Sequence, residues 1–511
     1  MWDSGRIVDR ASRKVIPMGR LNNTKTTALI SYMAVFLNAL IGILFTPFII
    51  RSLGNSQYGL YTISSSLIGF FLLDFGLGSA ASRFVSKYHV VGDKENEDRA
   101  MATIFRLYLY IDSVILIILA VVFLSISNIY KALTPTEIEQ LKVIFVISAF
   151  SSVFCFPFQI FNGILTSYEK YVHIKLADII SKVFMVATIT ITLLMNLGLY
   201  ALVIVHAVAA LITVAYKAFI IKKYTTAHLF IRNYDKGLVR EIVQFSLWIT
   251  VMAVSHRLIF TVVPSILGIV SNTTEAAHFS VVLTIENYLY LISTAFSGMF
   301  MPTISRIYTQ DNFEDNLLKL VIKVGKLIYG INIIIFIGLV FLGGDFFRLW
   351  AGPGYDEVHM GLLMVVFPSI FYNSMEVLNT AIMVKNKVKY TGLVNLCCGI
   401  VNIGLCFVTA KLWGANGACL SIMVATLARS VLTYVLFHRV LNINIWIVIR
   451  DVFIKTLPVA IIAVVFGLIG NVAISGTGWI SLIIRGGILV VGAVIGVLMF
   501  MRKEVLSVLK K

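Results

Sequence analysis

The feature that most constrains this chain is a series of long apolar runs that recur along its whole length. A helix of about 20 apolar residues crosses a hydrocarbon core of about 30 Å, and runs of at least that length recur throughout the 511 residues. They are too long, and alternate too little, to be strands of an outer-membrane barrel. Because 59% of the residues are hydrophobic and 13% are charged, a soluble fold could not cover the apolar surface. The chain is therefore predicted to be an all-α polytopic membrane protein.

The apolar runs divide into about fourteen predicted transmembrane helices. They cover residues 28–50, 58–82, 101–126, 141–167, 172–197, 199–222, 242–267, 278–305, 320–344, 359–384, 390–411, 414–438, 453–474 and 479–501. The polar segment 1–27 stands ahead of a full-length first span, which is not typical of a cleavable signal peptide.

The basic residues predict which way the spans run. The N-terminal segment, every second connection after it and the C-terminal tail hold most of the 42 Lys and Arg residues. The opposite connections hold five: Arg51, Lys131, Lys142, Arg348 and Lys411. The positive-inside bias then places both termini in the cytoplasm. The net charge of +17 reflects this topology and attraction to anionic lipid, so no nucleic-acid partner is expected. We call the two sides of the molecule the inner end and the outer end accordingly.

The chain is predicted to divide near its middle, at the longest inner connection. The predicted parts are a cytoplasmic segment 1–27, a six-helix bundle 28–222, a cytoplasmic linker 223–241, a second six-helix bundle 242–440, two additional helices 453–501 and a cytoplasmic tail 502–511. Residues 45–63 and 262–281 form a faint repeat, because each has a Pro near the outer end of an odd span and then a polar turn. Many transporters are built from two such pseudo-symmetric halves around a central cavity.

Motifs for ATP hydrolysis, metal binding or acyl transfer are missing from the sequence. Gly325 and Lys326 run straight into Leu327, so there is no phosphate-binding loop. The five cysteines all lie in predicted spans and none has metal-ligand spacing. We therefore expect no cofactor, no metal and no enzymatic activity. In the longest outer connection, Thr136 to Glu139 resembles a capping box that opens the fourth span.

Charged side chains inside the spans are costly and mark candidate functional sites. Arg257 follows His256 near the middle of span seven, too deep for its side chain to reach the interface. Its guanidinium could hold a phosphate bidentately in a central cavity. The alternative is a buried ion pair with Glu286 or Glu376 that locks helices together.

The other intramembrane charges carry weaker or competing interpretations. Glu286, with Tyr288 and Tyr290 nearby, could take up a coupling ion, bind sugar hydroxyls, or neutralise Arg257. Structural pairing is expected for Glu376 with Arg429, and for Asp178 with Lys182, four residues apart on one helix face. Asp112 is expected to be structural: it has no partner within its own helix, and Lys182 is a candidate partner for it as well as for Asp178. Arg106 and Arg485 lie near helix ends, so their side chains are expected to snorkel to the interface.

Three short segments resemble a known family. They are SQYGLY (56–61), DFGLGSAASRF (74–84) and SGMFMPTISRIY (297–308). With the length and topology, they resemble the polysaccharide flippases, the Wzx-like branch of the multidrug/oligosaccharidyl-lipid/polysaccharide exporter superfamily. The resemblance implies a V-shaped pair of bundles in which spans one, two, seven and eight line a central cavity. It also implies alternating access, with export of a glycan on undecaprenyl diphosphate from the inner to the outer leaflet.

The resemblance assigns roles to particular residues. Arg257 and His256 match the cationic grip on the diphosphate, with Arg83 at the inner mouth of span two, whereas span one has no charged residue at all. Glu286 and Glu376 are then candidate coupling or gating carboxylates. Asp74, in the stretch FLLDFGLGSAASRF, is either a third such carboxylate or a tether for Arg83 and its loop. H⁺ or Na⁺ is the expected coupling ion.

Two other functions stay open at the level of the sequence. An ion-coupled multidrug exporter of the same superfamily would bind amphipathic cations in an acid-lined cavity. A membrane polysaccharide polymerase or ligase would need a long outer loop with Arg or His, which the sequence lacks. The favoured function is export of repeat units for O-antigen, capsule or exopolysaccharide, in association with a polysaccharide polymerase and chain-length machinery.

Overall fold

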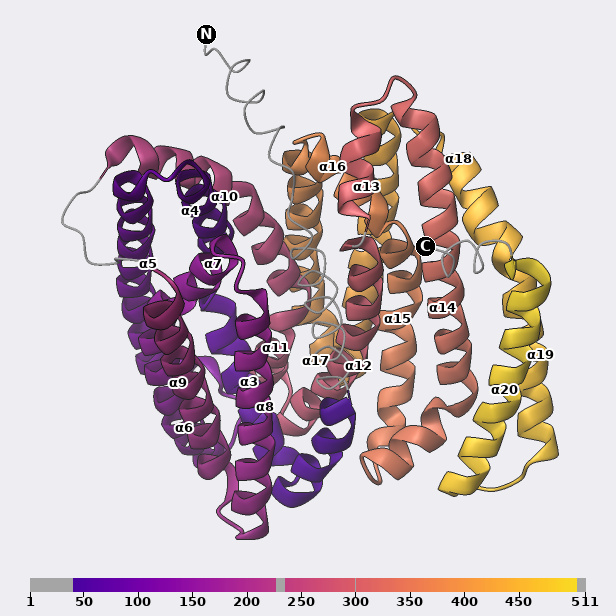
Figure 1. Cartoon of the computed structure of the whole chain (residues 1–511). Helices are drawn as coiled ribbons and strands as arrows, with labels where there is room; N and C mark the ends of the chain where they lie inside the picture. The colour runs from indigo at the N-terminus through magenta and orange to yellow at the C-terminus, as the bar shows by residue number, and fades with distance from the viewer. Residues whose placement is uncertain (1–39, 227–234, 299, 503–511) are drawn as a thin grey trace.

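The computed structural model describes residues 40–226, 235–298 and 300–502, and in these ranges every regular element is a helix. In Figure 1 the helices from α4 to α9 gather on the left with α10 beside them, whereas α12 to α17 lie in the centre and on the right. The last two long helices lie at the right-hand edge, beside the second group (Figure 1). The predicted segment 1–27 and residues 503–511 of the predicted tail 502–511 lie outside the described residues.

The first bundle consists of a helix over Leu40–Leu53 and the elements up to α9. These are α3 (Asn55–Phe71), α4 (Leu77–Val91), α5 (Lys94–Ile129), α6 (Pro135–Cys155), η1 (Phe156–Gln159), α7 (Ile160–Ser167), α8 (Tyr171–Leu194) and α9 (Gly198–Tyr224).

The second bundle runs from α10 to α17 and is followed by the additional helices. The elements are α10 (Lys236–His256), η2 (Arg257–Thr261), α11 (Val263–Val270), α12 (Thr273–Gly298), α13 (Met301–Tyr308), α14 (Phe313–Trp350), η3 (Tyr355–Glu357), α15 (Val358–Ser374), α16 (Glu376–Val384), α17 (Val388–Leu441), α18 (Ile445–Val448), η4 (Ile449–Phe453), η5 (Ile454–Thr456), α19 (Leu457–Ala473) and α20 (Trp479–Phe500).

Nine helices in the described ranges are long and apolar enough to cross a membrane, or ten if the bent pair α15 and α16 is one span. The multi-pass, all-helical class is therefore confirmed. The count of fourteen stays a prediction, because the first span begins outside the described residues and several other spans are broken.

Two predicted spans are not continuous. Span two is interrupted between Phe71 and Leu77, where Phe75 and Gly76 adopt left-handed φ values of 52° and 67°. The span over 359–384 bends by 45° at Met375, between α15 and α16. Hydropathy alone does not predict either interruption, because the segments on both sides of each break are apolar.

The helices on both sides reach into the predicted linker 223–241, because α9 ends at Tyr224 and α10 begins at Lys236. Residues 227–234 lie outside the described part, but the last residues of the segment 223–241 are helical, because Asp235 caps α10. Its carboxylate accepts hydrogen bonds from the amides of Gly237 (2.8 Å) and Leu238 (3.2 Å), which satisfies two N–H groups that a helix start leaves free.

The outer start of α6 corrects the predicted capping box. Thr134, and not Thr136, caps the helix: its hydroxyl accepts from the Glu137 amide at 3.3 Å, and the Glu137 carboxylate accepts from the Thr134 amide at 3.0 Å. Pro135 occupies the first helical turn, where its missing N–H costs nothing, and this fixes the start two residues earlier.

The segments that suggested an internal repeat meet in space. α3 packs along α12, and at Gly59 the backbone of Thr273 comes so close that a β-carbon would lie 1.9 Å from its carbonyl oxygen. The starts of the second helix of each half therefore form one contact between the bundles.

The additional helices are fixed to the second bundle by a buried ion pair. Arg485 on α20 contacts Asp345 on α14 at 2.7 Å and donates to the Gly476 carbonyl at 3.1 Å. Arg485 is 7% exposed, so the expectation that it snorkels to the interface was wrong. Because a partner stands beside it, the side chain does not need to reach water.

Candidate functional site

Arg257 lies at the junction of the two bundles. It is the first residue of a π-helical turn, and its Nη2 donates to the carbonyl oxygen of Leu72 at 3.1 Å, just where α3 ends. The last carbonyls of a helix carry partial negative charge and lack intrahelical partners, so they attract a cation. This is the one hydrogen bond of the Arg257 guanidinium to the described residues. No ion pair with Glu286 or Glu376 is found there, so the expected helix-locking pair does not form.

The wide turn that holds Arg257 has a cause in the sequence. Pro264, in the following turn, has no N–H to give to the carbonyl four residues earlier. The buried amide of Asn402 donates to the carbonyls of Leu258 (3.2 Å) and Ile259 (3.1 Å), and Ser66 donates to that of Thr261 (2.5 Å). Neighbouring helices thus satisfy the carbonyls that the π-turn exposes. Polar Asn402 and Ser66 in apolar spans were the available sequence signals.

Asp74 stabilises the break in span two. One of its carboxylate oxygens accepts from the amide of Gly78 at 3.1 Å, at the start of α4, and the other accepts from the hydroxyl of buried Tyr108. Arg83 does not contact Asp74; its guanidinium stacks on the ring of Phe245, 4.6 Å from the centroid. The tether between Asp74 and Arg83 is therefore wrong, whereas a coupling role stays a prediction.

Arg83 and Arg257 contact different levels of the helix that begins with α10. Phe245, under Arg83, precedes Arg257 by twelve residues, which is about 18 Å along a helix that rises 1.5 Å per residue. Arg83 is exposed on the inner half of α4.

A buried polar cluster fills the second bundle beside Arg257. Arg429 on α17 is 6% exposed, and its guanidinium lies 3.8 Å above the ring of Tyr372. It interacts electrostatically with Glu286, Glu376 and His256. The ring of His256 lies 5.8 Å from that of Tyr290, which joins the cluster.

The two glutamates of this cluster share one guanidinium without a direct ion pair. Glu286 is 3% exposed; its Oε1 accepts from Ser369 at 3.5 Å and its Oε2 has no partner in the described part of the chain. Glu376 accepts from Asn379 at 2.9 Å. Buried Glu286 and half-buried Glu376 beside one Arg429 leave an excess negative charge that burial makes costly. The cluster can therefore hold a proton or a small cation.

Tyr288 lies apart from this cluster. Its hydroxyl occupies the space beside Gly42 where a β-carbon would be, so it touches the first helix. The predicted set of sugar-binding residues is thus divided: Tyr290 faces Glu376 and Arg429, whereas Tyr288 belongs to the contact between the bundles.

The predicted structural pairs form differently or not at all. Asp178 contacts Lys217 on α9 at 3.5 Å and Lys175 at 4.0 Å, not Lys182. Lys182 instead lies near His206. One carboxylate oxygen of Asp112 is buried with no hydrogen-bond partner among the described residues. A partner on a neighbouring helix competes with the residue one turn away, and the sequence does not show which helix that is.

At the outer end, the first helix is fastened to the end of α14. Arg51 donates to the carbonyls of Leu349 (2.8 Å) and Trp350 (3.1 Å), a cation at a helix C-terminus. The indole N–H of Trp350 donates to the carbonyl of Ile43 at 2.6 Å.

Further contacts at this end join α3 and α6 to the second bundle. The Glu137 carboxylate accepts from Ser56 (2.7 Å) and, across the interface, from Thr273 (2.8 Å). Tyr355 donates to the side-chain oxygen of Asn55 at 2.9 Å. We call these residues, with Arg51 and Trp350, the outer latch.

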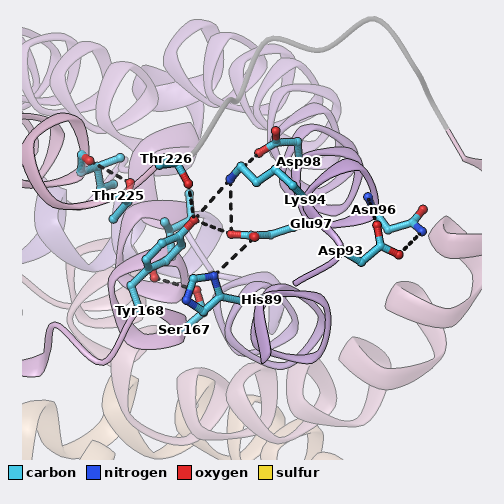
Figure 2. Close-up of polar contacts among 12 residues, drawn as sticks. His89, Asp93, Lys94, Asn96, Glu97, Asp98, Ser167, Tyr168, Thr225 and Thr226 are labelled. Carbon is cyan, nitrogen blue, oxygen red and sulfur yellow. Dashed lines mark hydrogen bonds and ion pairs between the residues drawn. The ribbon is translucent and has the colours of Figure 1, made fainter. Parts of the chain in front are cut away.

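At the inner end, a separate polar cluster joins three loops of the first bundle (Figure 2). Buried Glu97 accepts from Tyr168, and Lys94 contacts both Glu97 (3.6 Å) and Asp98 (3.1 Å). The Tyr168 hydroxyl also lies 3.4 Å from the hydroxyl of Thr226, the last described residue before the connection to α10. The cluster thus fastens the beginning of that connection to the first bundle.

Comparison with known proteins agrees with the helical, multi-pass architecture. The structure is similar to that of the lipid II flippase MurJ in an inward closed conformation: the TM-score is 0.74, the identity 15%, and 93% of this chain and 99% of that chain are covered. It is also similar to an inward-facing multidrug resistance MATE family transporter of the MOP superfamily, with a TM-score of 0.64, 13% identity, and coverage of 80% and 98%. The fold is therefore that of a polytopic flippase or transporter.

The sequence comparisons indicate a particular family, whereas the structural comparisons indicate only the fold. Residues 25–308 match the family model described as polysaccharide biosynthesis protein, and the chain belongs to this family. It is also 21% identical, over 405 residues, to a Shigella flexneri protein assigned as an O-antigen transporter, with 78% of this chain and 93% of that protein covered.

Proposed function

We propose that this chain is a flippase that moves oligosaccharide repeat units linked to undecaprenyl diphosphate from the inner to the outer leaflet of a bacterial inner membrane. The observation that carries the proposal is Arg257. Its guanidinium has five N–H donors, of which one is engaged by Leu72 in the described structure. A planar guanidinium matches a phosphate bidentately, and Arg257 lies where both bundles contribute to its surroundings.

Alternating access is proposed to deliver the substrate. The outer latch holds the bundles together at the outer end by polar contacts such as those of Arg51 and Glu137, which could break and re-form during transport. The central cavity implied by the family resemblance, and the inward orientation of both termini, belong to this proposal. The lipid tail would stay in the bilayer while the charged head crosses beside Arg257.

The buried carboxylates are proposed to couple transport to H⁺ or Na⁺. Glu286 and Glu376 share the single positive charge of Arg429, so a bound H⁺ or Na⁺ would stabilise the cluster. Release of that ion would leave two carboxylates beside one guanidinium. His256 and Tyr290 connect this cluster to Arg257 in sequence and space. Association with a polysaccharide polymerase completes the proposed pathway, in which the glycan would serve O-antigen, capsule or exopolysaccharide.

The proposal is tested by replacing Arg257 in a cell that depends on this chain for surface polysaccharide. Arg257→Ala is expected to reduce export at least tenfold, since it removes charge-assisted hydrogen bonds worth about 1.5–3 kcal/mol each. Arg257→Lys should keep part of the activity. The matched control is Arg240→Ala, an exposed Arg at the inner end of the same helix, which should export normally.

Two outcomes would contradict the proposal. Full export by Arg257→Ala, with the protein present in the membrane, would show that transport does not require Arg257 to bind the phosphate. Resistance to organic cations that depends on Glu286, without any change in polysaccharide, would favour the multidrug exporter.

A further inference from the structure

Two adjoining hollows lie at the outer end of the second bundle, where the starts of α12 and α15 meet the middle of α17. The first is a polar cavity of about 90 Å³, and the second is an apolar groove of about 420 Å³. Trp413 and Asn416 line both, so the two lie side by side. The polar cavity is lined by Glu275, His278 and Glu357, and the groove by Met364 and Leu420.

The shape of the polar cavity is set by a kink in α17. Trp413 (φ −132°, ψ 20°) and Gly414 (φ 55°, ψ −134°) leave the helical conformation, and a new helical stretch starts at Ala415. Glu275 caps that stretch: its Oε2 accepts from the Ala415 amide at 2.6 Å. A β-carbon at Gly414 would lie 2.3 Å from the same oxygen, so the carboxylate and the glycine require each other.

Two carboxylates, those of Glu275 and of exposed Glu357, line the cavity, and no Lys or Arg is among the described residues that line it. The Glu357 carboxylate receives no hydrogen bond from the described residues, and Glu275 uses one oxygen for Ala415. His278 is 8% exposed, interacts electrostatically with both carboxylates, and has a buried Nε2 with no partner in the described part of the chain. A buried polar group without a partner is costly. Three groups that can accept hydrogen bonds therefore line this space, and Asn416, which also lines it, gives its side-chain N–H to the backbone carbonyl of Glu357 at 3.5 Å.

An ammonium group fits this space better than a metal ion. In the described ranges, no three His, Cys, Asp or Glu side chains are grouped closely enough to hold a metal. An ammonium is a compact cation with three donors and no strict geometry. Trp413, 60% exposed, sits at the outer end of its helix, where an indole lies at the level of lipid headgroups.

We propose that the cavity and the groove form a binding site for a phospholipid with a primary amine in its headgroup, such as phosphatidylethanolamine. The ammonium donates to Glu275, Glu357 and His278, and an acyl chain lies against Met364, Trp413 and Leu420. The site lies outside the cluster around Arg257 and Arg429, so it does not depend on the transported substrate. It would fix the second bundle to the outer leaflet beside the outer latch, through the shared start of α12.

The test is lipid binding to the purified, delipidated full chain, measured by native mass spectrometry. Three lipids with identical acyl chains are compared: phosphatidylethanolamine; phosphatidylcholine, whose ammonium has no N–H; and phosphatidylglycerol, which has no amine. Wild type is expected to bind phosphatidylethanolamine about tenfold more tightly than either, as expected for losing one charge-assisted hydrogen bond. Glu357→Gln should remove this preference. The matched control is Asp356→Asn, a neighbouring exposed carboxylate that does not line the cavity.

A second variant tests the groove independently of the charge. Leu420→Trp fills the groove and should weaken all three lipids by a similar factor, without restoring or removing the headgroup preference. Equal affinity of wild type for the three lipids would overturn the proposal. An equal effect of Asp356→Asn and Glu357→Gln, or unchanged affinity in Leu420→Trp, would overturn it as well.

Discussion

Arg51 offers the sharpest test of how the bundles are held together. Its guanidinium binds the carbonyls of Leu349 and Trp350, the last two residues of α14, at 2.8 and 3.1 Å, and the bonds connect the first helix to the second bundle. A cation at a helix C-terminus is worth about 0.3–1 kcal/mol when exposed, and each hydrogen bond adds about 0.5–1.5 kcal/mol net. Discounted for exposure, Arg51→Ala should weaken closure of the outer end by about 1–2 kcal/mol, a factor of roughly 5–30 in population.

The assay is a distance measurement between spin labels at the outer end. Asn196, in the turn before α9, and Lys411, before the kink in α17, are exposed and belong to different bundles. Labels at these positions should give one short distance in the wild-type background and an additional longer one in Arg51→Ala. Arg51→Lys should lie between them. Lys131→Ala, which removes another exposed cation at the same end, is the control. An unchanged distance distribution in Arg51→Ala, or the same change in Lys131→Ala, would refute the reasoning.

Three further predictions concern the interior and the inner end. Asp74→Ala should lower the free energy of unfolding by about 1 kcal/mol, measured by thermal unfolding, as expected for a lost helix cap. Asp74→Asn should unfold like wild type, because its side-chain oxygen still accepts from the Gly78 amide. Loss of export in Asp74→Asn would show that the carboxyl group does more than cap the helix. Asn402→Leu should lower the free energy of unfolding by about 1–3 kcal/mol in the same assay, because the buried carbonyls of Leu258 and Ile259 lose their donor. An unfolding temperature equal to that of wild type would show that these carbonyls do not need the Asn402 amide. Tyr168→Phe removes the donor to buried Glu97, so trypsin should cut more quickly near Lys222 and Lys223; an unchanged rate would mean that the inner cluster does not hold this connection.

The spans and their order could be predicted because lipid imposes a single requirement on every residue that faces it. Hydropathy therefore located the two additional helices, whose predicted ranges 453–474 and 479–501 correspond to α19 and α20. Breaks inside spans could not be located in the same way. The stretch from Leu72 to Gly76 is mostly apolar, and what interrupts the helix is a carboxylate that caps its continuation.

The partners of buried charges were the least predictable part of the site. The sequence indicates only neighbours along one helix, so Asp178 was paired with Lys182, whereas Lys217 on α9 is the residue that faces it. The contact of Arg257 with Leu72 depends on a helix end that the sequence does not reveal. The cluster around Arg429 likewise brings together α10, α12, α15, α16 and α17, whose packing order is not written in any one of them.

The buried pair between Arg485 and Asp345 has a consequence for how the protein is made. Asp345 is synthesised 140 residues before its partner, and until α20 emerges from the ribosome only Arg348, at 3.3 Å, can neutralise it. The outer end of α14 therefore reaches its final environment only when the last helix of the chain has entered the membrane. A nascent chain that stops after α19 would present an underneutralised carboxylate at that boundary, a mark by which quality-control proteases could distinguish incomplete copies from finished ones.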